Sequence, residues 1–318
     1  MQRTSLSAAI LVTAITLVQP AYGQFARTEV LTFESEDKTV AETLNGSAGK
    51  KIVFAGVLRI PKAGQKHPAV VLMHGAGGVG GANSPTDLWS NVFNAAGIAT
   101  FNVDGYSPRG ITTLAEGQRL SAHARVHDAF GALEVLAKHP LIDAKKIAIM
   151  GFSHGGPSAI FSNVVRFQKK GSDVRFAAHI SMYGVCSATL RGEDDTTSPL
   201  LVLHGAADDW VPAAPCKEYA DKLRAKNRPV TVIEYPDSHH VFDSPLAGPA
   251  TKRDNVTTAG SCRFEEVDGG KFVNVATKQP LTPADACMVK GPTAGYNEAM
   301  TKKAHADAVS FLKDVFQH

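Results

Sequence analysis

Three residue types that cooperate in nucleophilic catalysis lie far apart in this sequence of 318 residues, each after an apolar run. Ser153 lies in GFSHGG, Asp208 in HGAADDWVP and His240 in YPDSHHVF. A serine hydroxyl is a poor nucleophile at neutral pH, so it needs an imidazole to accept its proton, and the imidazole needs a carboxylate to orient it. The three residues therefore predict a Ser-His-Asp triad, provided that the fold brings them together.

The surroundings of Ser153 favour a catalytic role over a serine that simply caps the following helix. The apolar residues 147–150 predict a strand, and the small residues after Gly155 predict the start of a helix. A sharp turn of this kind between glycines is typical of a nucleophile elbow, which exposes the hydroxyl at the end of a strand. We therefore expect Ser153 to attack a carbonyl carbon.

Strand-like and helix-like segments alternate through most of the chain. Strands are expected at 30–33, 51–60, 68–75, 97–105, 147–150, 176–184, 199–205 and 230–236, and helices at 85–96, 113–138, from the Ser153 turn to about 167, at 216–225 and at 298–316. The alternation predicts an α/β fold with a mostly parallel, doubly wound sheet and helices on both faces. Such sheets place their sites at the carboxyl ends of the strands, where the three candidate residues occur.

The chain order serine, aspartate, histidine is the order of α/β-hydrolases, and the three motifs together resemble the dienelactone hydrolase family of that superfamily. The resemblance covers about residues 51–242 and the closing helix, and it implies the α/β-hydrolase fold and a hydrolase activity. The family pattern H-G-x-x-D-x-x-V-P falls on residues 204–212, which favours Asp208 over Asp209. The pattern Y-P-x-x-x-H-x-F falls on residues 235–242, which favours His240 over His239.

The sequence departs from the dienelactone hydrolases proper at the proposed site. Ser153 stands where they carry cysteine, and Gly75 stands where they carry glutamate, so their scheme of thiol activation does not carry over. Arg109 in DGYSPRG could hold a substrate carboxylate, as an arginine of that family does, or it could form an ion pair within its loop. A second arginine expected just after the histidine is absent. The resemblance therefore implies hydrolysis without implying the lactone substrate.

The remaining parts of the expected site are two amides and one aromatic side chain. An oxyanion needs preorganised donors, and we expect the backbone N–H groups of His154, directly after the nucleophile, and of Ala76, after the strand 68–75. Trp210 is expected to bind substrate as part of the pocket wall, although burial in the core is an equal alternative. The expected partner is a small-molecule ester or lactone.

Alternative functions remain open on the sequence alone. Gly75-x-Gly77-x-x-Gly80 follows a strand and Asp104 ends the next one, which imitates a dinucleotide fingerprint, although the helix is expected only from Pro85. A peptidase of the prolyl-oligopeptidase kind would use the same triad, and a non-catalytic hydrolase-fold binding protein would usually lack a member of it. The expected reaction requires no cofactor, and no metal is expected, because HARVH at 123–127 lacks the glutamate of a zinc protease.

The N-terminus predicts export. Arg3 precedes the apolar residues 8–18, and Pro20 and small residues follow, which is the pattern of a secretory signal peptide spanning residues 1–23. A packed N-terminal helix is the alternative. We expect cleavage after Gly23, a secreted or periplasmic product and a single domain over residues 24–318.

Export changes the interpretation of the four cysteines, because an even number in an oxidising compartment favours disulfides. Three pairings are possible. We favour Cys186–Cys216 and Cys262–Cys287, because each pair flanks a segment that would otherwise be a mobile loop. The second pair falls in residues 243–296, which break the alternation with prolines, glycines and polar residues. We expect an ordered insertion there that forms one wall of the pocket.

Composition excludes two classes of partner. The chain is 44% hydrophobic and 20% charged, its formal net charge is +3, and no run of lysines or arginines offers a nucleic-acid surface. After the first twenty residues no segment is apolar enough to span a bilayer, so no membrane contact is expected once the signal peptide is cleaved. The sequence gives no indication of the oligomeric state.

Overall fold

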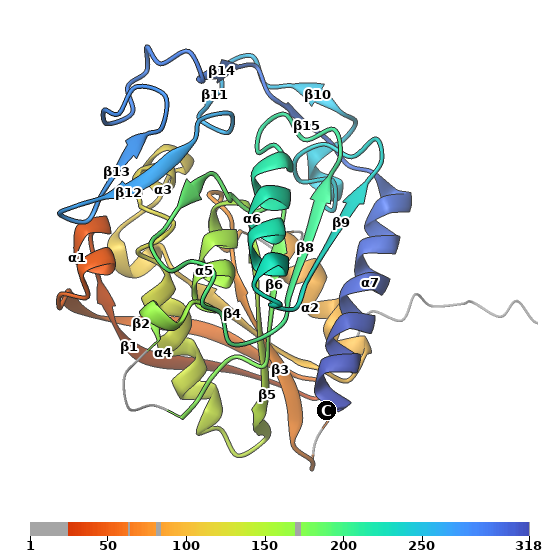
Figure 1. The fold of residues 1–318 in the computed structure, drawn as a ribbon. Helices are drawn as coiled ribbons and strands as arrows, with labels where there is room; N and C mark the ends of the chain where they lie inside the picture. The colour runs from red at the N-terminus through yellow and green to blue at the C-terminus, as the bar shows by residue number, and fades with distance from the viewer. Residues whose placement is uncertain (1–24, 63, 81–83, 169–172, 318) are drawn as a thin grey trace, which may run out of the picture.

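The computed structural model describes residues 25–62, 64–80, 84–168 and 173–317, and the predicted signal peptide lies outside them. A sheet of eight strands crosses the molecule in the order β1-β2-β4-β3-β5-β6-β8-β9 (Figure 1). Its strands are β1 (Arg27–Asp37), β2 (Lys50–Ile60), β3 (His67–Met73), β4 (Ala99–Asp104), β5 (Ile142–Phe152), β6 (Ala178–Met182), β8 (Leu200–Gly205) and β9 (Val230–Tyr235). The pairs β1–β2 and β2–β4 are antiparallel and the others are parallel, which confirms the predicted α/β class.

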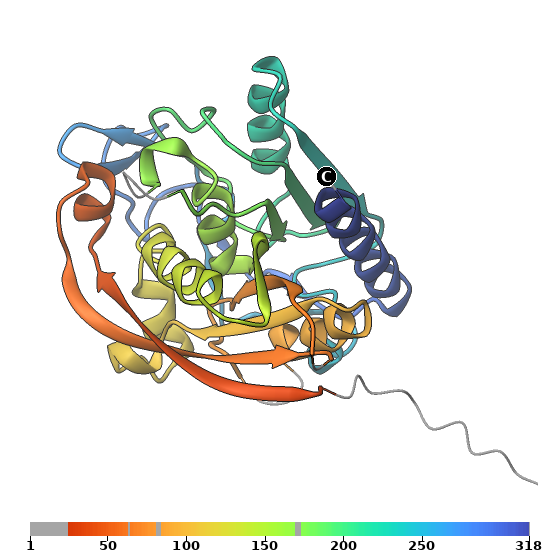
Figure 2. The same ribbon diagram turned by 90° about the horizontal axis from the view of Figure 1, so that it is seen from below.

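Helices cover both faces of this sheet. Successive side chains of a strand point to opposite sides, and in the central strands both sets are apolar, so each face needs a layer of helices to bury it. In β3, Val70 and Leu72 pack in the core beneath α2 and α7, whereas Val71 and Met73 pack in the core beneath α4. Figure 2 shows α7 and α4 on different sides of the strands. The helices are α1 (Val40–Asn45), α2 (Pro85–Ala95), α3 (Leu114–Arg119), α4 (Val126–Ala137), α5 (Gly156–Phe161), α6 (Ala214–Ala225) and α7 (Glu298–Gln317), with 3-10 turns η1 (Ser107–Arg109), η2 (Ser153–Gly155), η3 (Val165–Phe167) and η4 (Pro245–Ala247).

Two predicted helices differ from the structure. The single helix expected over 113–138 is wrong: α3 ends at Arg119, Leu120 is extended, and α4 begins at Val126. The break turns the fully buried Arg125 inward, where it donates to the carbonyl of His74 at 2.8 Å. The helix after Ser153 is also shorter than expected, because the side chain of Asn163 bonds to the segment that precedes β8.

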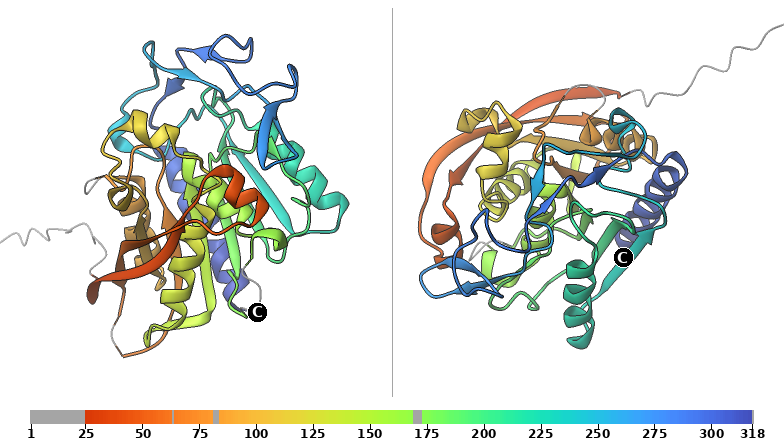
Figure 3. Two further views of the ribbon diagram at one scale, coloured as in Figure 1. Left: turned by 90° about the vertical axis from the view of Figure 1, so that its left-hand side faces the viewer. Right: turned by 90° about the horizontal axis from the view of Figure 1, so that it is seen from above.

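Residues 251–294 lie above the carboxyl ends of the parallel strands (Figures 1 and 3). They form short paired strands: β10 (Thr251–Lys252) with β15 (Thr293–Ala294), β11 (Thr257–Thr258) with β14 (Val289–Lys290), and the hairpin β12 (Phe264–Val267) and β13 (Lys271–Asn274), where β12 also pairs with β7 (Ala188–Thr189). Disulfide bonds join Cys186 to Cys216 and Cys262 to Cys287, the two pairs that the sequence favours. No helix among the described residues is long and apolar enough to cross a membrane.

Candidate active site

Ser153 occupies a strained turn directly after β5. Its φ is +48°, a left-handed conformation that is costly for a residue with a side chain and that persists only where the surrounding structure enforces it. The flanking glycines are needed by packing: a Cβ on Gly151 would overlap the carbonyl of Gly155, and a Cβ on Gly155 would overlap the carbonyl of Met73. The turn from β5 into η2 and α5 therefore has the geometry of a nucleophile elbow.

The structure brings the three triad candidates together, although they come from the ends of separate strands. Ser153 Oγ lies 2.9 Å from Nε2 of His240, and Nδ1 of His240 lies 2.8 Å from Oδ2 of Asp208. Because Nδ1 faces a carboxylate, it carries the proton of the neutral ring and leaves Nε2 to accept from the serine hydroxyl. Both His240 and Asp208 are buried, so the hydrogen bonds are shielded from solvent.

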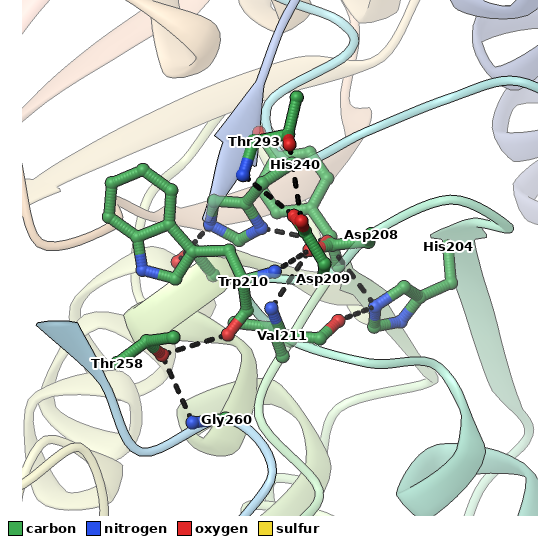
Figure 4. Close-up of polar contacts among 12 residues, drawn as sticks. His204, Asp208, Asp209, Trp210, Val211, His240, Thr258, Gly260 and Thr293 are labelled. Atoms are coloured by element: carbon green, nitrogen blue, oxygen red, sulfur yellow. Dashed lines mark hydrogen bonds and ion pairs between the residues drawn. The ribbon is translucent and has the colours of Figure 1, made fainter. Parts of the chain in front are cut away.

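Asp208 is held by the loop that follows β8 (Figure 4). Its Oδ1 accepts from the backbone N–H groups of Trp210 and Val211 at 3.0 and 2.8 Å. Its Oδ2 faces His240, and Nε2 of His204 lies 3.5 Å away. Burial alone would raise the pKa of the Asp208 carboxyl, but the charge of His240 and hydrogen bonds from His204 and His240 lower it well below its usual range. The aspartate therefore stays ionised while it orients the imidazole.

The neighbouring aspartate has a different role. Asp209 accepts from the backbone N–H and the hydroxyl of Thr293 at 2.7 and 3.1 Å, which ties the Asp208 loop to β15 (Figure 4). The hydroxyl of Thr258 donates to the carbonyl of Trp210 at 2.9 Å, a second tie from the same segment. The half-buried Trp210 ring lies 5.3 Å from the ring of His240 at an interplanar angle of 31°. Trp210 therefore lies beside the triad.

The loop that carries His240 is strained and anchored by residues that the sequence analysis missed. Val241 has φ +54°, which is rare for a β-branched residue. Asp243 is fully buried and accepts from Nε1 of Trp89 at 2.7 Å and from the hydroxyl of Tyr183 at 2.8 Å. The Tyr183 ring also meets the His240 ring edge-on at 5.0 Å. The sequence indicated a role for Asp243 only through its position three residues after the histidine. Its partners Trp89 and Tyr183 are distant in the chain, so the sequence did not predict these hydrogen bonds.

The loop after β3 passes beside Ser153. A Cβ added to Gly75 would lie 3.3 Å from the carbonyl oxygen of Phe152 and 3.5 Å from Cβ of Ser153. The peptide that carries the Ala76 amide therefore borders the elbow, and His154 follows Ser153 within η2. The first amides of a helical turn have no acceptor within the turn, so they can donate to an oxyanion. The two expected donors thus belong to the two segments next to the serine hydroxyl.

The expectation that Arg109 holds a substrate carboxylate is wrong. Its side chain is 3% exposed, and its guanidinium donates to Asp37 at 2.6 Å and to both oxygens of Asp128 at 2.7 and 3.1 Å. Another hydrogen bond reaches the carbonyl of Gly105 at 2.8 Å. Arg109 therefore forms ion pairs within the protein, the alternative that the sequence left open, because its donors are already bound to protein acceptors.

The features that imitate a dinucleotide site have local structural roles. Asp104 accepts from the backbone N–H groups of Tyr106 and Ser107 at 2.9 and 3.0 Å, so it closes its own turn. Helix α2 begins at Pro85 with Ser84 as its N-cap, beyond the glycines of the loop. Within the described ranges, no group of three or more His, Cys, Asp or Glu side chains could hold a metal ion.

The fold and the arrangement of the site define the class of α/β-hydrolases. Residues 54–316 match the model of the dienelactone hydrolase family, so the chain belongs to this family. Two solved structures share the fold. A putative dienelactone hydrolase from Klebsiella pneumoniae is 18% identical, with a TM-score of 0.50 over 69% of this chain and 90% of its own. A dienelactone hydrolase-like promiscuous phosphotriesterase from metagenomic libraries is 15% identical, with a TM-score of 0.60 over 91% and 98%.

Curated relatives match over shorter stretches. The acylamino-acid-releasing enzyme 1 of Oryza sativa subsp. japonica is 23% identical over 62% of this chain and 30% of its own length. The inactive dipeptidyl peptidase 10 of Rattus norvegicus is 25% identical over 46% of this chain and 21% of its own. The chain therefore spans less than a third of the length of either relative, and the activity or inactivity stated in each name belongs to that relative.

Proposed function

We propose that the protein is an exported serine hydrolase that cleaves carboxylic esters or lactones through an acyl-enzyme. The observation that carries this proposal is the unbroken hydrogen-bonded chain from Ser153 Oγ through His240 to Asp208. Membership of a family of hydrolases supports the class of reaction. The serine in place of the family's cysteine requires an adjacent base for activation, and His240 is placed to act as that base.

The reaction then follows from the geometry. As Ser153 Oγ bonds to the substrate carbonyl carbon, its proton passes to Nε2 of His240, and the carbonyl oxygen becomes an oxyanion. Asp208 stabilises the imidazolium that forms, and the amides of His154 and Ala76 receive the oxyanion. The imidazolium returns the proton to the leaving alcohol as the ester C–O bond breaks. Water then attacks the acyl carbon as the imidazole takes its proton, and the imidazolium returns that proton to Ser153 Oγ as the bond from Oγ to the acyl carbon breaks and the acid leaves.

A serine peptidase is the second candidate, because residues of this chain match the acylamino-acid-releasing enzyme of rice over 237 positions. The two functions share the triad and differ in the leaving group. We favour esters or lactones because the matching family model is that of dienelactone hydrolase and spans residues 54–316. A non-catalytic binding protein remains the third candidate, since one relative is named as inactive.

A panel of p-nitrophenyl esters, a lactone and aminoacyl-nitroanilides tests these candidates. We expect wild type to hydrolyse esters, and Ser153→Ala to lower kcat by at least about 10⁴-fold, as for loss of a triad nucleophile. Ser158→Ala is the matched control, because Ser158 is fully buried on α5 five residues after the nucleophile. Turnover of the anilides alone would favour the peptidase, and turnover of no substrate would favour the binding protein.

Export is part of the proposal and has its own test. Two disulfides support an oxidising compartment, where such bonds persist. Expression of the full chain in a bacterium with a periplasm should give a mature protein that begins at Gln24 in the periplasmic or medium fraction. Recovery of the whole protein in the cytoplasm with Met1 retained would contradict the export proposal and leave the hydrolase proposal standing.

A further inference from the structure

A fully buried guanidinium lies behind the elbow and the loop after β3. Arg125 is 0% exposed and directly precedes α4. Its Nη1 donates to the carbonyl of His74 at 2.8 Å and makes a longer hydrogen bond of 3.5 Å to Nδ1 of His154. One nitrogen atom therefore contacts both segments that carry the expected oxyanion-hole amides.

The contact with His74 acts on the first amide through the His74 residue, whose side chain binds the carbonyl of the peptide that carries the Ala76 N–H. Arg125 holds the His74 carbonyl, and Nδ1 of His74 donates to the carbonyl of Gly75 at 2.7 Å. Nε2 of His74 accepts from the backbone N–H of Gly105 at 3.1 Å, which fixes the ring. Because a trans peptide is planar, its N–H points away from its C=O. The Gly75 carbonyl is bound by Nδ1 of His74 and also accepts from the N–H of Gly78 at 3.2 Å, so the Ala76 N–H cannot rotate unless these two hydrogen bonds break.

The contact with His154 fixes the second segment. Nε2 of His154 donates to the carbonyl of Leu120 at 2.8 Å, so Nδ1 is the acceptor that faces Arg125. Burial and then the charge of Arg125 lower the pKa of His154 to about 3, which keeps this ring neutral at physiological pH. The side chain next to the nucleophile is therefore held from both ends of its ring.

The charge of Arg125 is not neutralised in the way that the charge of Arg109 is. Arg109 pairs with Asp37 and Asp128, whereas among the described residues no carboxylate lies within ion-pair distance of Arg125. The Tyr106 ring lies 5.4 Å from its guanidinium carbon. A buried charge without an ion-pair partner is costly, and in a low-dielectric site it stabilises a negative oxygen nearby.

We propose that Arg125 is a positioning residue for the proposed reaction: it aligns the amides of Ala76 and His154 toward the oxyanion and adds a positive charge behind them. This inference rests on the proposed serine hydrolase function. Its effect belongs to the tetrahedral state, because the substrate carbonyl carries little charge before attack.

The test compares wild type with Arg125→Gln and Arg125→Lys. The readouts are kcat and KM for p-nitrophenyl butyrate and the affinity for phenylboronic acid, which adds to an active serine as a tetrahedral anion. For Arg125→Gln we expect kcat to fall about 10–100-fold and KM to change less than about threefold. This loss of kcat is smaller than the roughly 10²–10³-fold loss on removal of an oxyanion-hole donor, because both amides remain in the variant. Boronate affinity should fall by a similar factor, and Arg125→Lys, which keeps the charge, should recover part of both losses.

Asn163→Ala is the matched control for lost stability, because Asn163 is equally buried and bonded to backbone groups away from the elbow. It should unfold at a lower temperature and retain kcat and boronate affinity per folded molecule. If Arg125→Gln does not fold, His154→Ala provides the test, since it removes the contact with Arg125 and keeps the backbone amide. We expect His154→Ala to lower boronate affinity about 3–10-fold.

The outcomes separate the two proposals. Folded Arg125 variants with kcat and boronate affinity equal to an active wild type would overturn the positioning role alone. Where Arg125→Gln does not fold, an unchanged boronate affinity of His154→Ala would do the same. A folded wild type that neither turns over esters nor binds the boronate would overturn the proposed function, and the positioning role with it.

Discussion

At the scale of single residues, the motifs selected three side chains that the structure brings into hydrogen-bond contact, and they misjudged one neighbour. The family patterns favoured Asp208 and His240 over the adjacent Asp209 and His239, and the structure places the favoured pair in contact. Arg109 was misassigned because a motif does not show whether a guanidinium is already neutralised. Its partner Asp37 is 72 positions away in the chain, so the ion pair arises only from the tertiary fold.

The first prediction concerns the residue that orients the histidine. Asp208→Asn should fold and lower kcat about 10³–10⁴-fold, because an amide in place of the carboxylate favours the wrong tautomer of His240. Asp209→Asn is the matched control. Asp209 bonds to Thr293 rather than to the histidine, so its loss should lower kcat less than about tenfold. Steady-state kinetics on one ester checks both, and equal losses in the two variants would contradict the assignment of Asp208.

At the scale of elements, the sequence predicted which segments form strands and helices better than where they stop. The apolar runs of the central strands were clear because those strands are buried on both faces. The break between α3 and α4 was missed because it lets Arg125 donate to the carbonyl of His74, and the two residues are 51 positions apart. Residues 243–296 were expected to form an ordered insertion, but no local pattern indicated that Thr258 and Thr293 within them would hold the Asp208 loop.

The second prediction concerns this segment. Disulfide Cys262–Cys287 joins residues 25 positions apart, so replacing both cysteines with serine should cost roughly 3 kcal/mol of stability or less. The segment also contacts the histidine loop: Ala294 forms an isolated parallel β-bridge with His240, and the N–H of the next residue, Gly295, donates to the carbonyl of His240 at 3.2 Å. We therefore expect faster proteolysis within 251–294 and an altered ratio of kcat/KM between short and long p-nitrophenyl esters.

The double variant Cys186→Ser, Cys216→Ser is the control for the loss of a disulfide as such. Its disulfide joins the segment before β7 to α6, outside residues 251–294. It should lower stability without the same change in the ester ratio. An unchanged ratio in the Cys262, Cys287 variant, despite faster proteolysis of the segment, would contradict a role of this segment in substrate choice.

At the scale of the whole molecule, buried neutral histidines make stability depend on pH. Burial lowers the pKa of His179 to about 3, and burial and then the charge of Arg125 lower that of His154 to about 3. Burial lowers the pKa of His74 as well, although its hydrogen bond to the Gly75 carbonyl opposes the shift. An unfolded histidine binds a proton below about pH 6.5, so acid favours the unfolded chain.

The third prediction follows from this linkage. The free energy of unfolding should fall as pH decreases from about 6.5 toward 4, by up to about 1.4 kcal/mol per pH unit for each such histidine. His179→Asn should lower this slope by about 1.4 kcal/mol per pH unit, the contribution of one proton. The variant lacks the buried imidazole, which in wild type is held neutral against the carbonyl of Ala159. Urea unfolding at a series of pH values measures the slope. An identical slope in wild type and variant would contradict the assignment of His179.

Labelling with a fluorophosphonate followed by peptide mass spectrometry shows whether His240 activates Ser153, because the probe reacts with a serine only where a base activates it. We expect one adduct per molecule, on Ser153, and its loss in both Ser153→Ala and His240→Ala. An unlabelled folded protein, or an adduct on another residue that persists in Ser153→Ala, would show that Ser153 is not an activated nucleophile.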